Sequence, residues 1–259
     1  MSTTRIHSSA VVHTRAQVGR NCDIGPYCVL GEHVALGDDC RLHSHVVIDG
    51  HTALGRGNEI FPFVSIGLKT QDLKWSGGVT RTEIGDHNTF REHATVHSAT
   101  SGSGATIIGS DNHLLAYCHV AHDCRLGNHI IMSNVATLAG HVVVEDYAVV
   151  GGLAAVHQFC RIGRMAIIGG CSKVVQDVPP FMLADGNPAE TRTINKVGLD
   201  RNGVSEEVQG VLKQAYKILF REGLTISNAL AKIESELAPS PELKHLVQFV
   251  RQSERGISK

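Results

Sequence analysis

The stretch AQVGRNCDIGPYCVLGEHVALGDDCRLHSHVVI, residues 16–48, decides the fold. It carries an apolar residue at every sixth position, from Val18 through Ile24 and Leu30 to Ile48. A period of six fits neither the 3.6-residue repeat of an amphipathic helix nor the simple alternation of a half-buried strand. It indicates a repeat architecture, in which each short unit buries its apolar side chain only by stacking on its neighbours.

The same register extends far beyond this stretch. Of the 29 sixth positions from 6 to 174, 26 are apolar. The exceptions are Asp72, Gly78 and Gly102, which lie in GLKTQDLKWSGGVTRTE and SATSGSGAT, two segments rich in loop residues. We therefore predict one long repeat unit over residues 1–186, interrupted by an external loop at about 68–83.

The residue two places before each apolar position is usually small, and strand alternation puts both side chains on the same face. A large and a small residue together fill a narrow interior. This hexapeptide signature predicts a mainly β protein, a parallel β-helix with three hexapeptides in each triangular coil. The period does not fix the hand of the coil, and the left-handed sense follows from the resemblance described below.

The register also sorts the reactive residue types. Six of the seven cysteines fall at the small inward position and are predicted to be buried packing residues. Fifteen of the sixteen histidines lie in the repeat region and none is at an inward position, so they belong to turns and outer faces. Without a C-x-x-C pair, neither a disulfide framework nor a standard zinc site is indicated.

Composition narrows the class of protein. The formal charge of −1 and a pI near 7 give no sign of a broad basic surface, so we expect no nucleic-acid partner. The first residues lack an apolar core of signal-peptide length, and no run approaches the roughly 18 apolar residues of a membrane span. We expect a cytoplasmic protein without a transmembrane segment.

The period ends after VVQDVPPFMLADGNP, and residues 187–259 are predicted to form a C-terminal helical domain. Ser205 is a candidate N-cap for a helix that presents Val208, Leu212 and Leu219 on one face and ends before Gly223. A second helix fits about residues 225–237, and Ser240-Pro241 opens a third. Such short helices should pack on the coil and cap it.

Residues eighteen apart should stack directly, about 4.8 Å apart, wherever the repeat is unbroken, as it is from 108 to 174. This arithmetic gathers a polar cluster at one corner of the prism, with His119 on the adjoining face. The cluster is His122, Asp123, Gly140, His141, His157 and Gln158. Such residues suit a metal site, or a general base beside an orienting acid with a glycine N–H for an oxyanion.

Several motifs, HVAHDC, LAGHV, GGLAAVHQFCRIG and QDLKW, make the chain resemble the UDP-N-acetylglucosamine O-acyltransferases, and the resemblance runs on through the tail AYKILFREG. It implies a left-handed coil and a homotrimer with active sites between subunits. The implied reaction moves a 3-hydroxyacyl chain from acyl carrier protein to the 3-hydroxyl of the UDP-sugar, the first step of lipid A synthesis. It uses no cofactor beyond the phosphopantetheine arm of the carrier protein, and no metal.

The resemblance also implies residue roles. His122 would be the general base, Asp123 its partner and Gly140 the source of the oxyanion N–H. Gly170 would form the floor of the acyl groove and so set chain length. The implied substrate-binding residues are Gln71, Asp72, Lys74, His119, His141, His157, Gln158, Asn195 and Arg201.

The sequence departs from the family pattern at three places. Val197 and Asn202 stand where the family often has a glutamate and a second arginine, and in REHATVHSAT the usual Arg-Gly does not follow His97. Acyl carrier proteins are acidic, so a basic docking patch is required, for which we name Arg161, Arg164 and Lys173. Four alternatives stay open: a 3-amino acceptor sugar, a coenzyme A-dependent acyl- or acetyltransferase, a carbonic anhydrase-type metalloenzyme, and a solenoid without catalysis.

Overall fold

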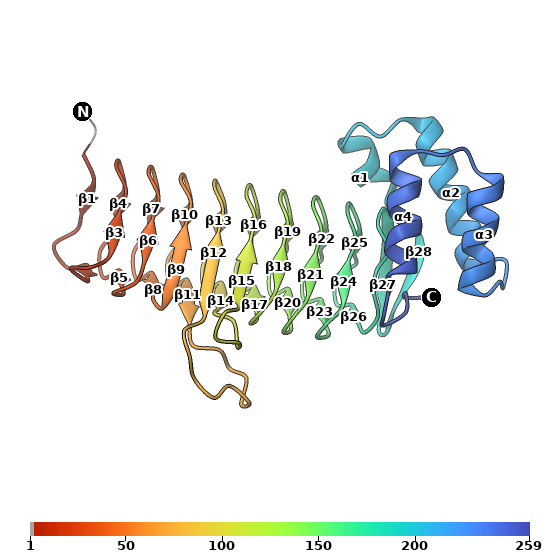
Figure 1. Cartoon of the computed structure of the whole chain (residues 1–259). Helices are drawn as coiled ribbons and strands as arrows, with labels where there is room; N and C mark the ends of the chain where they lie inside the picture. Colours follow the sequence, from red (N-terminus) through yellow and green to blue (C-terminus); the bar gives the residue numbers. More distant parts are fainter. Residues whose placement is uncertain (1–2) are drawn as a thin grey trace.

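The computed structural model describes residues 3–259 as a straight triangular prism with helices at its C-terminal end (Figure 1). Three sheets form its faces, and their strands pair in parallel except at the β27–β28 hairpin. The first contains β1 (Arg5–Ile6), β4 (Asp23–Ile24), β7 (Arg41–Leu42), β10 (Glu59–Ile60), β13 (Thr89–Phe90), β16 (His113–Leu114), β19 (Ile131–Met132), β22 (Val149–Val150), β25 (Ile167–Ile168), β27 (Met182–Gly186) and β28 (Ala189–Ile194).

The other two faces have the same construction. The second sheet contains β2 (Val11–Val12), β5 (Val29–Leu30), β8 (Val47–Ile48), β11 (Ser65–Leu68), β14 (Thr95–His97), β17 (His119–Val120), β20 (Thr137–Leu138), β23 (Ala155–Val156) and β26 (Lys173–Val174). The third contains β3 (Gln17–Val18), β6 (Ala35–Leu36), β9 (His51–Leu54), β12 (Arg81–Ile84), β15 (Ala105–Ile108), β18 (Arg125–Leu126), β21 (Val143–Val144) and β24 (Arg161–Ile162). The predicted left-handed parallel β-helix class is confirmed.

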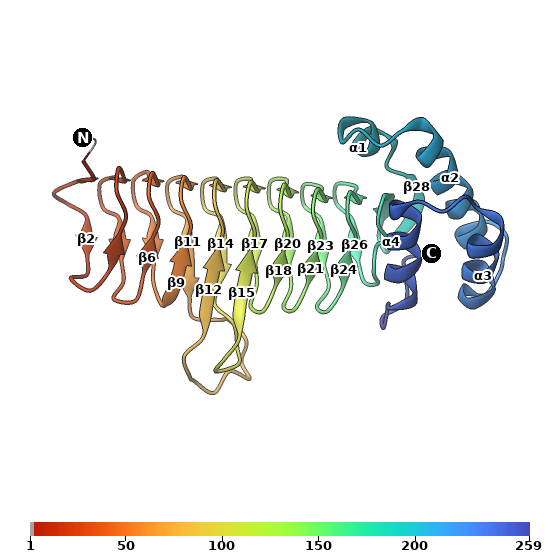
Figure 2. The ribbon, with the colours of Figure 1, turned by 45° about the horizontal axis from the view of Figure 1, so that its top comes forward.

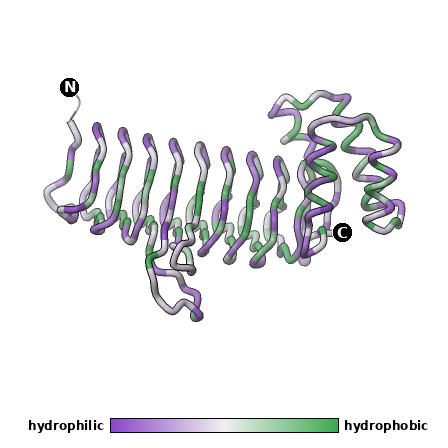
Figure 3. The backbone as a smooth tube through the Cα atoms, viewed as in Figure 1, coloured by the Kyte–Doolittle hydropathy of each residue, from purple (hydrophilic) through white to green (hydrophobic). Residues whose placement is uncertain are grey.

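The interior is filled by the two inward positions of each hexapeptide, and apolar segments recur in every coil (Figure 3). All six cysteines assigned to the small inward position are buried, and Cys171 alone is exposed. Three stacked asparagines also lie inside. The Oδ1 atom of Asn58 accepts hydrogen bonds from the backbone and side-chain N–H groups of Asn88, and Asn88 does the same for Asn112.

Two loops interrupt the stacking. Ile60 pairs with Phe90, thirty residues on, and Phe90 pairs with Leu114, twenty-four residues on, whereas Leu114 pairs with Met132 at the ordinary spacing of eighteen. The first insertion is the loop 69–80 between β11 and β12, slightly shorter than the predicted 68–83. The second is the loop 98–104 between β14 and β15. Both project from the same side of the prism (Figures 1 and 2).

Four helices follow the antiparallel hairpin β27–β28: α1 (Lys196–Arg201), α2 (Glu206–Phe220), α3 (Ile226–Glu236) and α4 (Pro241–Arg251). Ser205 and Ser240 cap α2 and α4 as predicted, whereas α1 was not predicted. Leu212 and Leu246 join one apolar cluster with Phe181 at the end of the coil, so the helices cover its open end. The last residues add a further rung, in which Ile257 bridges to Asp177.

Candidate active site

The corner between β17 and β18 carries a histidine and an aspartate side by side. The Nδ1 atom of His122 lies 2.9 Å from Oδ2 of Asp123, and the two side chains are only 15% and 12% exposed. A carboxylate bound at Nδ1 holds that proton in place and leaves Nε2 as the basic atom. The pair therefore has the arrangement of a general base and its orienting acid.

Asp123 is held by the loop 98–104. The hydroxyl of Thr100 donates to Oδ2 at 2.6 Å and its backbone N–H donates at 3.1 Å. Burial acts to raise the pKa of Asp123, but the hydrogen bonds from Thr100 and His122 outweigh it, so the pKa lies below its usual value. The carboxylate is thus ionised at neutral pH and fixed in orientation.

Gly140 lies against His122 on the next coil. A Cβ atom at Gly140 would lie 2.3 Å from Cε1 of His122, so only glycine leaves room for the ring. The backbone N–H of Gly140 has no acceptor among residues 3–259 and can donate to a ligand. An N–H group beside a base can stabilise a developing oxyanion.

His141, on the next coil, contacts both His122 and Asp123. Its backbone N–H donates to the carbonyl oxygen of His122 at 3.0 Å, and its Nε2 lies 3.7 Å from Oδ2 of Asp123. Its ring stacks on Phe159 of the following coil, with the centroids 4.7 Å apart. The two imidazoles therefore approach the same carboxylate oxygen from different coils.

Two further imidazoles on the adjoining face are neutral. Burial, with repulsion from His97 and His122, lowers the pKa of His119 to about 4. Burial and His122 also lower the pKa of His97. His119 Nδ1 is 2.7 Å from the hydroxyl of Thr95, so Nε2 remains for a ligand. Neutral rings offer hydrogen bonds to a polar substrate without adding charge.

The loop 69–80 reaches this corner. Oδ2 of Asp72 lies 3.9 Å from Nε2 of His122, and Oδ1 of Asp72 accepts a hydrogen bond from the backbone N–H of Lys74. Lys69 lies over the ring of Trp75, which fixes the base of the loop. Three predicted substrate-binding residues, Gln71, Asp72 and Lys74, are therefore on this loop, and Asp72 is the one that contacts the base.

His157 and Gln158 lie at the same corner one coil further on, as the arithmetic predicts. The side chain of His157 does not contact His122. Its Nδ1 atom lies 3.2 Å from the carbonyl oxygen of Gln158 and 3.4 Å from the guanidinium of Arg255. Arg255 comes from the C-terminal tail. Sequence reasoning missed it, since no spacing rule connects it to the corner, and it missed Thr95 and Thr100 for the same reason.

Three predicted residues lie apart from the corner within one chain. Asn195 is the N-cap of α1, accepting from the N–H of Gly198, and it donates to the carbonyl oxygen of Met165. Arg201 is in the last turn of α1, which projects from the opposite side of the prism to the loop 69–80 (Figures 1 and 2). Gly170 lies between β25 and β26, where an added Cβ would meet only the Gly152 carbonyl oxygen, at 3.4 Å.

The three basic residues named for docking do not share one face. Arg161 is on β24 in the third sheet, packed over Phe249 and 3.7 Å from Glu145. Lys173 is on β26 in the second sheet, and Arg164 lies over Tyr147. Arg161 and Arg164 thus lie together beside Glu145, whereas Lys173 is in another sheet, and the role of the three residues in docking stays a prediction.

Other chemistry at the corner is restricted by the surrounding contacts. Burial raises the pKa of Cys124 to about 12, which keeps this thiol protonated and unsuited to nucleophilic attack. The ligand atoms of His122, Asp123 and His141 lie within 4.8 Å of one another, close enough to hold a metal. However, Oδ2 of Asp123 already accepts hydrogen bonds from Thr100 and His122. This arrangement favours an oriented base over a metal site.

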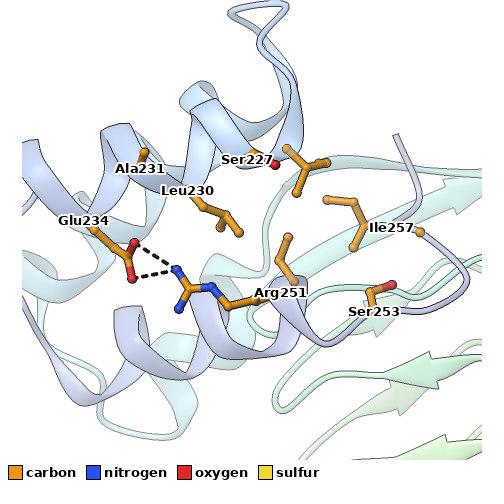
Figure 4. Close-up of a pocket in the computed structure, with 10 residues that line it drawn as sticks. Ser227, Leu230, Ala231, Glu234, Arg251, Ser253 and Ile257 are labelled. Carbon is orange, nitrogen blue, oxygen red and sulfur yellow. Dashed lines mark hydrogen bonds and ion pairs between the residues drawn. The ribbon is translucent and has the colours of Figure 1, made fainter.

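A separate pocket of about 490 Å³ lies between α3, α4 and the C-terminal tail (Figure 4). Its charged residues, Glu234 and Arg251, are paired with each other at 2.9 Å. None of the predicted site residues lines it. The pocket therefore offers no free acid or base, and the candidate site stays at the corner.

Known proteins resemble this chain over most of its length. The bacterial transferase hexapeptide profile matches residues 15–50, and the UDP N-acetylglucosamine O-acyltransferase domain 2 profile matches residues 177–258. An acyl-[acyl-carrier-protein]--UDP-N-acetylglucosamine O-acyltransferase of Thermodesulfovibrio yellowstonii is 49% identical over 218 residues, 84% of each chain.

Solved structures agree with this likeness. LpxA from Acinetobacter baumannii superposes with a TM-score of 0.95 at 44% identity, covering 98% of this chain and 99% of its own. LpxA from Bacteroides fragilis, a UDP-N-acetylglucosamine acyltransferase, gives 0.96 at 38% identity, covering 98% and 100%. Within residues 3–259, none of the helices has the length and apolar character needed to span a bilayer.

Proposed function

The chain belongs to the UDP-N-acetylglucosamine O-acyltransferase family, and from this premise we propose that it transfers a 3-hydroxyacyl chain from acyl carrier protein to the 3-hydroxyl of UDP-N-acetylglucosamine, the first step of lipid A synthesis. The observation that carries the mechanism is the 2.9 Å contact between Nδ1 of His122 and Asp123. It leaves Nε2 of His122 free to act as the base.

In the proposed mechanism, Nε2 of His122 removes the proton of the sugar hydroxyl as its oxygen attacks the thioester carbonyl carbon. The N–H of Gly140 donates to the oxygen of the tetrahedral intermediate. Collapse breaks the carbon–sulfur bond, and the proton passes from His122 to the sulfur of the phosphopantetheine arm. Asp123 stabilises the imidazolium that exists between the two proton transfers.

The transfer is proposed to be direct, without an acyl-enzyme. Cys124, two residues after the base in the sequence, is buried and its pKa is raised to about 12. No cofactor is required beyond the arm of the carrier protein. We propose that the sugar and diphosphate are held by Gln71, Asp72 and Lys74. The residues that line the rest of the site are His119, His141, His157 and Gln158.

We further propose a homotrimer whose sites lie between subunits. This would bring Arg201 and Asn195 of one subunit to the corner of another, from which they are separated within one chain. An exposed row along one edge supports an interface, since Tyr27, Phe63, Tyr117 and Leu153 are each at least half exposed. Mixing inactive His122→Ala and Arg201→Ala chains tests the arrangement: shared sites would restore activity, and independent sites would not.

The decisive experiment offers the purified protein a mixture of 3-hydroxyacyl carrier proteins together with UDP-N-acetylglucosamine and its 3-amino analogue, with products identified by mass spectrometry. The proposal predicts that the products are 3-O-acyl esters of UDP-N-acetylglucosamine. An amide as the main product would move the acceptor to the 3-amino sugar. Transfer from acetyl coenzyme A alone, or chelator-sensitive activity with stoichiometric metal, would contradict the proposal.

A further inference from the structure

The loop 98–104 has no counterpart in the repeat and no role in the mechanism so far. It lengthens one coil by six residues, since Val96 pairs with Val120 at a spacing of twenty-four. The loop is anchored at its start, because Ala99 is fully buried and Ser98 accepts a hydrogen bond from the hydroxyl of Thr80. Thr100 makes the hydrogen bonds from this loop to the catalytic corner.

Thr100 binds the carboxylate of Asp123 through two groups. Its hydroxyl donates to Oδ2 at 2.6 Å and its N–H donates to the same atom at 3.1 Å. Charge-assisted hydrogen bonds of this kind are about twice as strong as neutral ones. They fix the rotation of the carboxylate about its side-chain bonds.

The orientation of the carboxylate determines which of two imidazoles it hydrogen-bonds. Nδ1 of His122 is 2.9 Å from Oδ2, and Nε2 of His141 is 3.7 Å from the same oxygen. A small turn of Asp123 would exchange a hydrogen bond to His122 for one to His141. Such an exchange would remove the orienting group from the base while leaving the fold unchanged.

We propose that Thr100 is a positioning residue, which holds the Asp123 carboxylate on His122 and keeps it from His141. The inference rests on the proposed function of His122 as the base. It assigns the loop 98–104 a purpose, namely to place one hydroxyl and one N–H over the carboxylate. Thr100 itself touches no reacting atom.

The test compares Thr100→Val, which keeps the shape and removes the hydroxyl, with Thr100→Ser, which keeps the hydroxyl. Thr4→Val is the matched control, because Thr4 also donates a 2.7 Å hydrogen bond but lies at the far N-terminal end of the coil. We expect kcat to fall roughly ten- to hundredfold in Thr100→Val, as expected for a misplaced catalytic group. KM should change less than twofold, with activity near wild type in Thr100→Ser and Thr4→Val.

Two further measurements distinguish a positioning role for Thr100 from a purely structural one. The acid limb of the kcat/KM profile should move to lower pH in Thr100→Val, because His122 loses its carboxylate partner. The loss caused by Thr100→Val should also be smaller in a His141→Ala background, where the competing imidazole is absent. An unchanged acid limb, or an equal loss in both backgrounds, would overturn the proposal.

Proton NMR of the protein without substrate gives an answer independent of turnover. The Nδ1–H of His122 should give a low-field resonance in the wild type and in Thr100→Ser that is missing in Thr100→Val. If the wild type showed this resonance but no acyl transfer, the proposed function would fail while the role of Thr100 stood. If the resonance survived in Thr100→Val, the role of Thr100 would fail alone.

Discussion

The imidazole of His122 lies directly against the backbone of Gly140, which belongs to the next coil of the prism. A Cβ atom on Gly140 would lie 2.3 Å from Cε1 and 2.5 Å from Nε2 of the ring. The glycine therefore does more than supply an N–H, because its missing side chain creates the space in which the proposed base lies.

Gly140→Ala should move the His122 ring away from its position while the coil stays folded. A displacement of about 1 Å can cost roughly a hundredfold in rate, so we expect a loss of that order in kcat with little change in KM. Gly210→Ala is the control, since an added Cβ there meets nothing within 4 Å. Steady-state kinetics and circular dichroism of both variants check the prediction, and normal turnover in Gly140→Ala would contradict it.

His122→Ala should lose roughly 10²- to 10⁴-fold in kcat, the usual contribution of a general base. His129→Ala makes a matched control, because His129 also lies at a corner and stacks on Tyr147, away from the site. Thermal melting should show both variants folded. If the two variants were equally active, His122 could not be the base.

The depressed pKa of His119 makes stability depend on pH. The unfolded chain takes up this proton near pH 6.5, whereas the folded protein does so near pH 4. Between these values the unfolded state binds more protons, so stability falls as the pH is lowered, by at most about 1.4 kcal/mol per pH unit. Urea unfolding at pH 7 and pH 5 should show a smaller loss in His119→Gln, and equal losses would refute the assignment.

Gly170→Met should shorten the acyl chain that the enzyme prefers. An added Cβ at Gly170 meets only the Gly152 carbonyl oxygen at 3.4 Å, so a side chain has room to extend into the space that a long acyl chain would fill. Competition among hydroxyacyl carrier proteins of different lengths, read by mass spectrometry, should shift toward shorter products. The same length distribution as the wild type would remove Gly170 from the groove.

The coil and the corner around His122 could be predicted from the sequence, because in an unbroken repeat residues eighteen apart stack on one another. From Ile108 to Val174 every eighteenth residue pairs as predicted, and this placed Gly140 and His141 beside His122. The cysteines followed from the same rule. Their burial needed no knowledge beyond which hexapeptide position faces inward.

The contacts made by the two loops could not be predicted from the repeat. Thr100 reaches Asp123 and Asp72 reaches His122 only because two insertions change the spacing to thirty and twenty-four, and packing rather than period fixes the path of an insertion. Arg255 arrives beside His157 from the end of the chain by way of the final rung. The three basic residues named for docking were chosen by their nearness in the sequence, and the structure places Arg161 and Lys173 in different sheets, so their role in docking stays a prediction.

Asp123 and His141 share a backbone conformation with the other corners of the prism. Their φ angles are 60° and 61°, and non-glycine residues at the equivalent corner position range from 54° to 68°. A histidine and aspartate moved one coil along would therefore meet the same main-chain geometry. This corner differs in the two insertions that reach it, through Asp72 and Thr100, and in the glycine at position 140 that leaves room for the His122 ring. New chemistry on such a coil therefore requires an added loop and a few side-chain changes rather than a new fold.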